Sequence, residues 1–197
     1  MRMRNKLAIA ALSVSMFCLI NSCGESESVT GGEKSNVTFI DFFKLNPLAT
    51  YLHVCMNPMD PTYDDGAIDP EPILLSDYGI NPGDSLVIEV IGEYLNGNEP
   101  REYVVAVFST SGTLLDKSET HRVPGAVEAG EDYDTGTTYG CGGEPTDIPE
   151  DFFCTPKVYI TVPVGATHLF LCPDDSYYED NTDEDDDYGV NISRVDA

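Results

Sequence analysis

The sequence predicts an all-β fold, a β-sandwich of the jelly-roll type. Its thirteen prolines and seventeen glycines divide the 197 residues into short runs. Those runs are rich in β-branched and aromatic residues, which is typical of strands that alternate with turns. No long stretch repeats apolar residues at the 3.6-residue period of an amphipathic helix. Short strands separated by turns are the pattern of sandwiches and jelly rolls.

The strands of this sandwich are expected at seven places along the chain. The sequence NPGD at residues 81–84 has proline and glycine at the central positions of a type II turn, and it precedes the clearest strand, SLVIEVIG. The run YVVAVFS is apolar at nearly every position, so its strand is expected to be mostly buried. In chain order, we predict strands at residues 36–42, 51–56, 85–92, 103–109, 157–162, 168–172 and 188–192.

The N-terminus has the organisation of an export signal. Arg2, Arg4 and Lys6 precede an apolar run, residues 7–20, that is too short to span a bilayer. The run ends at Ile20-Asn21-Ser22-Cys23, which resembles a bacterial lipobox except for the polar Asn21. We therefore predict a lipoprotein signal peptide over residues 1–22 and lipidation of Cys23. The alternative is an ordinary secretory signal with Cys23 as an incidental thiol.

Three regions follow from this interpretation: the signal peptide, a tether over residues 23–35, and a β-sandwich domain over residues 36–197. The tether is rich in Gly, Ser and Glu, a composition typical of flexible linkers. We expect an exported, membrane-anchored lipoprotein, placed in the outer membrane on the periplasmic side or at the cell surface. Its contact with the membrane would be through the lipid alone, because no other segment is long and apolar enough to span.

The net charge restricts the partners. It is −25 for the whole chain and falls to −28 without residues 1–22, which hold three basic residues and no acidic ones. This excludes nucleic acid as a natural partner, because phosphate binding requires a basic face. The many carboxylates either form a solvated surface or bind divalent cations, which prefer oxygen ligands.

Four cysteines remain after Cys23 and the signal peptide are set aside: Cys55, Cys141, Cys154 and Cys172. An even number in an exported chain predicts two disulfides, and three pairings are possible. The pairing Cys141–Cys154 would close a short loop within the strand-poor residues 117–156 and would leave Cys55–Cys172. A zinc site is the rival interpretation, but no CxxC or paired histidine accompanies these cysteines.

The acidic segment at residues 173–187 is the most informative part of the chain. It has nine carboxylates in fifteen residues and lies between two predicted strands, so it is a loop. Like charges at this density repel, and a divalent cation would relieve the repulsion. Carboxylates, amide oxygens and backbone carbonyls are the ligands that calcium prefers. When the positions of an EF-hand loop are counted from Asp183, neither the glycine position nor the glutamate position holds the required residue. A solvated turn without an ion is the alternative.

Three stretches of the chain together resemble a known family. These are NPGDSLVIEVIGEY, then YVVAVFSTSG, then VPVGATHLFLCPDDSYYEDN with YGVNIS. They resemble the PA-IL type of calcium-dependent, galactose-binding bacterial lectins over residues 73–193. The resemblance implies a galactose-binding-like sandwich in which the acidic loop holds a calcium ion, and the ion holds two sugar hydroxyls.

The resemblance also implies a ligand set. Asp175 matches the loop aspartate of the family, Tyr177 a position that offers its backbone carbonyl, and Asp180 and Asn181 a pair of Asn/Asp side chains. Asn96 lies near the position of a second backbone carbonyl. The segment between Asp175 and Tyr177 is shorter than in the galactose lectin, so Asp174 is an alternative ligand. The secondary sugar contacts, a His and a Gln, are missing, and residues 183–187 are an insertion that could add ligands or a second ion.

From these observations we expect a surface or periplasmic lipoprotein with a calcium-binding, carbohydrate-binding domain. The alternative is a structural or adhesive lipoprotein in which calcium only stabilises the fold. We do not expect an enzyme, because neither GxSxG nor HExxH is present. A hydrolase with paired carboxylates is a third hypothesis, but 35 acidic residues supply such pairs by chance.

Overall fold

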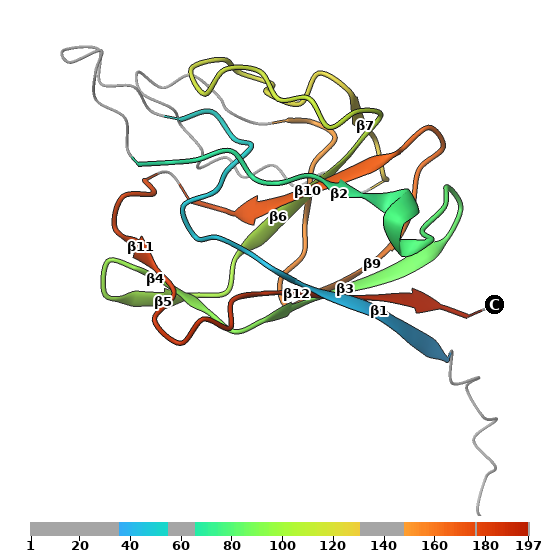
Figure 1. Cartoon of the computed structure of the whole chain (residues 1–197), viewed down its shortest axis with the longest axis horizontal. Helices are drawn as coiled ribbons and strands as arrows, with labels where there is room; N and C mark the ends of the chain where they lie inside the picture. Colours follow the sequence, from blue (N-terminus) through green and yellow to red (C-terminus); the bar gives the residue numbers. More distant parts are fainter. Residues whose placement is uncertain (1–35, 55–65, 131–147, 176, 197) are drawn as a thin grey trace, which may run out of the picture. The chain divides into compact units, whose positions relative to one another are not determined.

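The computed structural model describes residues 36–54, 66–130, 148–175 and 177–196. All of them belong to one compact unit, residues 34–197 (Figure 1). The predicted signal peptide, the lipidation site Cys23 and the tether lie outside the described residues. In the ranges that are described, no helix is long and apolar enough to cross a membrane.

The regular structure of the described residues is almost entirely β, as predicted, and it forms three antiparallel sheets. The first sheet has the order β1 (Val37–Lys44), β12 (Gly189–Val195), β3 (Ser85–Ile91) and β9 (Lys157–Thr161). The second has the order β2 (Ile73–Leu74), β10 (His168–Pro173), β6 (Val104–Ser109) and β7 (Ala126–Val127), and β8 (Phe152–Phe153) also pairs with β6. The third consists of β11 (Asn181–Thr182), β4 (Tyr94–Asn96) and β5 (Glu99–Arg101). One 3₁₀ helix, η1 (Leu75–Tyr78), follows β2.

The first two sheets pack face to face around the main hydrophobic core. Alternate residues of β3 point inward, so Leu86 and Ile88 are fully buried and meet Ala106 and Phe108 of β6. The other face of the second sheet is covered too. There, Val105 belongs to a second cluster of buried hydrophobic residues. This double burial explains why every residue of β6 is apolar or small.

One predicted strand is wrong. Residues 51–54 of the expected strand 51–56 form no ladder, although they are buried like a strand. Arg122 is the reason: its fully buried guanidinium donates hydrogen bonds to the carbonyls of Thr50 and Leu52, at 2.8 and 3.0 Å. It also forms an ion pair with Asp69. Carbonyls held by a side chain do not need a neighbouring strand, and the segment covers the second sheet as a loop.

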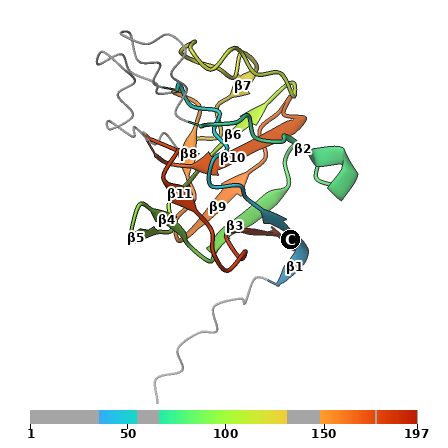
Figure 2. The same cartoon turned by 60° about the vertical axis from the view of Figure 1, so that its left-hand side comes forward.

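The third sheet lies at one end of the sandwich, and β1 reaches toward it (Figures 1 and 2). The last residue of β1, Lys44, is opposite Gly189 and forms an ion pair with Asp186 in the acidic segment. The first residue, Val37, lies at the opposite end of the same strand. Eight residues of strand span about 25 Å, so the acidic segment is far from the point where the chain enters the domain.

Candidate metal centre

The third sheet brings the two predicted ligand segments together. Asn181 of β11 lies opposite Asn96 of β4, in an antiparallel pair. The β4–β5 hairpin turns at Gly97, whose φ of +61° suits a residue without a side chain. The N–H of Gly97 donates to the carbonyl of Asp180 at 3.1 Å, and a Cβ on Gly97 would lie 3.2 Å from Asp180 Oδ2. The Asp180 carboxylate therefore lies against the hairpin.

Asp175 joins the same group. Its Oδ2 accepts a hydrogen bond of 2.8 Å from the side-chain amide of Asn96. Its Oδ1 accepts a bond of 3.3 Å from the backbone N–H of Tyr177. Four residues of the predicted ligand set, Asn96, Asp175, Asp180 and Asn181, are thus linked by direct contacts or by strand pairing.

The two other predicted positions, Asp174 and Tyr177, adjoin this group. The carbonyl of Asp174 accepts a hydrogen bond of 3.5 Å from the hydroxyl of Tyr94. The Tyr177 hydroxyl donates to Glu179 Oε2 at 2.5 Å, and its side chain is partly exposed. The family resemblance assigned Asn96 and Tyr177 as donors of backbone carbonyls. The structure records the side-chain amide of Asn96 as the group that reaches Asp175.

Asn181 has an unusual environment for a polar side chain. It is 4% exposed, and its Nδ2 donates to the carbonyl of Pro47 at 3.1 Å. That bond fixes the orientation of the amide, because the flipped amide would place two oxygens against each other. Its Oδ1 is buried and accepts no hydrogen bond from any residue that the structure describes. A buried acceptor without a partner costs about 1–3 kcal/mol, so this oxygen favours a ligand.

Buried tyrosines hold the loop on the core. The hydroxyl of Tyr178 donates to Thr50 Oγ1 at 3.0 Å, and the rings of Tyr94 and Tyr188 pack with their centroids 5.0 Å apart. Burial raises the pKa of Tyr94, Tyr178 and Tyr188 above the ordinary value for tyrosine. These phenols therefore stay neutral, and Tyr94 and Tyr178 serve the core rather than a sugar-stacking surface.

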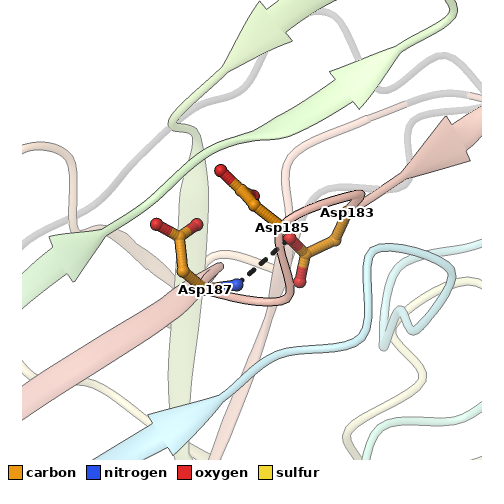
Figure 3. Close-up of side chains that lie close together, drawn as sticks. All are labelled: Asp183, Asp185 and Asp187. Atoms are coloured by element: carbon orange, nitrogen blue, oxygen red, sulfur yellow. Dashed lines mark hydrogen bonds between the residues drawn. The ribbon is translucent and has the colours of Figure 1, made fainter.

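A second acidic group lies in the insertion after β11. Ligand atoms of Asp183, Asp185 and Asp187 are within 4.8 Å of one another (Figure 3). Asp183 Oδ1 accepts the backbone N–H groups of Asp186 and Asp187, at 3.0 and 3.3 Å, which folds the segment into a tight turn. The sequence signal for this group is the unbroken run of five acidic residues at 183–187. They lie in the insertion predicted to be able to add ligands or a second ion, outside the ligand set that the resemblance implies.

The electrostatics of this second group are unfavourable. Desolvation by the surrounding chain, and then the nearby carboxylates of Asp185 and Asp183, raise the pKa of Asp187 above its ordinary value. Gly92 permits the close approach, because a Cβ there would lie 2.2 Å from Asp187 Oδ1. The φ of Gly92, +67°, is also one that residues with a side chain rarely adopt. The turn is therefore built around carboxylates that repel each other.

Cys154 and Cys172 are both buried and are not bonded to each other, while Cys55 and Cys141 lie outside the described residues. Burial raises the pKa of Cys172 to about 12, and that of Cys154 above its ordinary value. Cys172 is opposite Val105, and Val105 is opposite Phe153, so Cys172 and Cys154 are two strands apart. They also belong to clusters on opposite faces of the sheet. A disulfide requires Cα atoms within about 7 Å, so these two do not pair with each other. The predicted pairs Cys141–Cys154 and Cys55–Cys172 stay predictions.

We compared the chain with models of protein families, with curated proteins and with solved structures, and none of the three comparisons found a match.

Proposed function

We propose that the domain binds calcium through Asp175, Asp180 and Asn181, beside Asn96, and that the bound ion holds a carbohydrate. The observation that carries this proposal is the buried amide oxygen of Asn181, which accepts no hydrogen bond from a described residue. It belongs to the group that also contains the carboxylates of Asp175 and Asp180. A buried oxygen acceptor without a described donor, on the residue that follows Asp180 and opposite the residue that binds Asp175, favours a hard cation.

Calcium suits this donor set better than magnesium. Calcium takes about six to eight oxygen ligands in flexible geometry, whereas magnesium requires near-ideal octahedral geometry and keeps several waters. The proposed ligands come from the loop before β11 and from β11 itself, beside the β4 hairpin, and they include both carboxylates and an amide. A mixed set of this kind, within a segment of nine carboxylates, is typical of calcium sites.

Two arguments support a carbohydrate as the partner of the ion. The similarity to calcium-dependent lectins implies that sugar hydroxyls complete the coordination shell. The position of the loop is also suitable, because it lies about 25 Å along β1 from Val37, where the N-terminal part of the chain connects. On a lipoprotein anchored through Cys23, this end of the domain is available to glycans in the extracytoplasmic space.

A purely structural calcium site is the second candidate. The amide of Asn181 is bonded to Pro47, and Asn96 is bonded to Asp175, so an ion among these residues would join three segments of the chain. An ion in this position would stabilise the fold whether or not a sugar binds. The two candidates differ only in whether ligands bind through calcium.

A glycan array separates them. The folded domain is applied in calcium and in EDTA, together with the variant Asp180→Ala and the control Asn98→Ala, an exposed residue of the same hairpin. The carbohydrate proposal expects signals that require calcium, disappear in Asp180→Ala and persist in Asn98→Ala. Calcium that raises the Tm of the protein without any array signal would support the structural role instead.

A further inference from the structure

A cleft of about 530 Å³ lies between the end of β1 and the segment that contains β2 and η1. Phe42 and Tyr78 contribute aromatic rings to its lining, and these side chains are 38% and 37% exposed. The edge-on contact of Tyr78 with Phe43, with centroids 4.7 Å apart, holds the tyrosine ring in place. The cleft volume is in the range of ligand-binding pockets, which is about 300–1,000 Å³.

The cleft begins close to the proposed calcium ligands. Pro47 accepts the hydrogen bond of Asn181, and the preceding residues Leu45 and Asn46 line the cleft. Two residues of chain span at most about 8 Å. The same residues, Leu45 and Asn46, also line a neighbouring hollow of about 500 Å³ that Asn181 reaches. One short segment of the chain therefore borders both the cleft and the surroundings of Asn181.

The charges around the cleft select its ligand. The cationic group of Lys44 is paired with Asp186, and one oxygen of Asp69 is paired with Arg122. Glu71 and Asp77 have no ion-pair partner among the residues that the structure describes. The lining therefore has excess negative charge, which disfavours anionic ligands. Its carboxylates can accept hydrogen bonds from hydroxyl groups, and its rings offer apolar faces to a sugar ring.

We propose that this cleft binds further residues of a neutral glycan whose first sugar is held at the calcium site. The inference rests on the proposed function and extends it from a single sugar to an oligosaccharide. A basic peptide is the other occupant that the charges allow, and the test separates the two. The neutral glycan is favoured because the cleft is next to the site for which a sugar is already proposed.

The test is calorimetric titration with β-1,4-linked galacto-, manno- and gluco-oligosaccharides of one to six units, in calcium and in EDTA. In calcium, the affinity is expected to rise with chain length in at least one series. Tyr78→Ala is expected to weaken hexasaccharide binding about tenfold, while monosaccharide binding and the calcium-induced rise in Tm stay unchanged. Tyr78→Phe should behave like the wild type. Tyr159→Ala is the matched control, since Tyr159 is an aromatic residue, 69% exposed, on β9 and outside the cleft lining.

Equal affinity for one and six units, or unchanged hexasaccharide binding in Tyr78→Ala, overturns the cleft proposal, as does the absence of binding to every series. Binding of a lysine-rich peptide that Tyr78→Ala removes, without oligosaccharide binding, assigns the cleft to a basic partner and also overturns it. Hexasaccharide binding that survives EDTA but is lost in Tyr78→Ala keeps the cleft as a glycan site and refutes the role of calcium. These outcomes therefore distinguish a failure of the cleft proposal from a failure of the proposed calcium site.

Discussion

The side-chain amide of Asn96 donates a hydrogen bond of 2.8 Å to the carboxylate of Asp175. This bond joins the β4–β5 hairpin to the loop before β11, at the place where Asn181 lies opposite Asn96. Two segments that are far apart in the sequence are thus joined at the predicted ligand positions. The amide occupies one oxygen of Asp175, so the carboxylate is oriented before any cation binds.

The acidic turn after β11 should reduce stability at neutral pH. The pKa of Asp187 is raised in the folded state, so its contribution to stability is greatest below its unfolded pKa and is lost as the pH rises through its folded pKa. In EDTA at pH 7, Asp187→Asn is expected to raise the Tm, because the amide removes the charge and can still accept the backbone N–H of Glu93. The gain should vanish toward pH 3, where the carboxylate is protonated in both states. Thermal melts across this pH range measure it, and a lower Tm for Asp187→Asn at pH 7 would contradict it.

Arg122 should be one of the most important residues for stability. Its fully buried guanidinium satisfies the carbonyls of Thr50 and Leu52. Arg122→Met leaves these acceptors without a donor and is expected to reduce the free energy of unfolding by about 3 kcal/mol or more. Arg101→Met, which breaks the exposed pair with Glu99, is expected to cost less than about 1 kcal/mol. Urea denaturation of both variants provides the comparison. Similar losses for the two would show that the buried arginine has no special role.

The cysteine predictions are open to peptide mapping. The protein purified from an oxidising compartment is expected to have two disulfides among its four domain cysteines, and no linked peptide should join Cys154 to Cys172. In molecules of this protein that are reduced but still folded, the thiol of Cys172 should resist alkylation at pH 8, because it is fully buried and its pKa is about 12. A Cys154–Cys172 peptide in the digest would mean that the strand order of the second sheet is wrong.

The lipid anchor makes a separate prediction. Replacing Cys23 with serine should move the protein from the detergent phase of a membrane extract to the aqueous phase, because acylation of that thiol is the only membrane attachment expected. Cys55→Ser serves as the control, since it removes a cysteine that is expected to lie in a disulfide. If the Cys23 variant still partitions with detergent, the lipoprotein interpretation is wrong.

The all-β class and the main strands followed from the sequence because their signals are strong. Strands β3, β6, β9 and β10 contain continuous runs of apolar residues, β12 has Val190 and Ile192 at alternate positions, and a Pro-Gly turn precedes β3. The strands of the third sheet have two or three residues each, which is too short to show any period. Residues 51–54 resemble a strand in the sequence because three of the four, Tyr51, Leu52 and Val54, are apolar. A single arginine distant in the sequence decides otherwise, and no pattern predicts it.

The candidate site was predictable only in part. The acidic loop is visible as charge density, but its pairing with Asn96 was expected from the resemblance to calcium lectins rather than from the residues. The buried oxygen of Asn181 depends on Pro47, a residue of a different loop, and has no sequence signal. The aspartates at 183, 185 and 187 belong to an unbroken run of five acidic residues, and only the tight turn set by Asp183 brings these three carboxylates together.

Calcium titration of the metal-free protein tests the central claim most directly. The account predicts saturable calcium binding by calorimetry and a rise in Tm, because a ligand that binds only the folded state at a hundred times its Kd stabilises it by about 2.7 kcal/mol. For a domain of this size, the rise should be about 5 °C or more. Combined Asp180→Ala and Asn181→Ala substitutions should abolish both effects, whereas Glu184→Ala should leave most of each. Magnesium should produce a smaller shift. Identical melting curves in EDTA and in millimolar calcium, with no heat of binding, would contradict the account and leave the loop as a solvated turn.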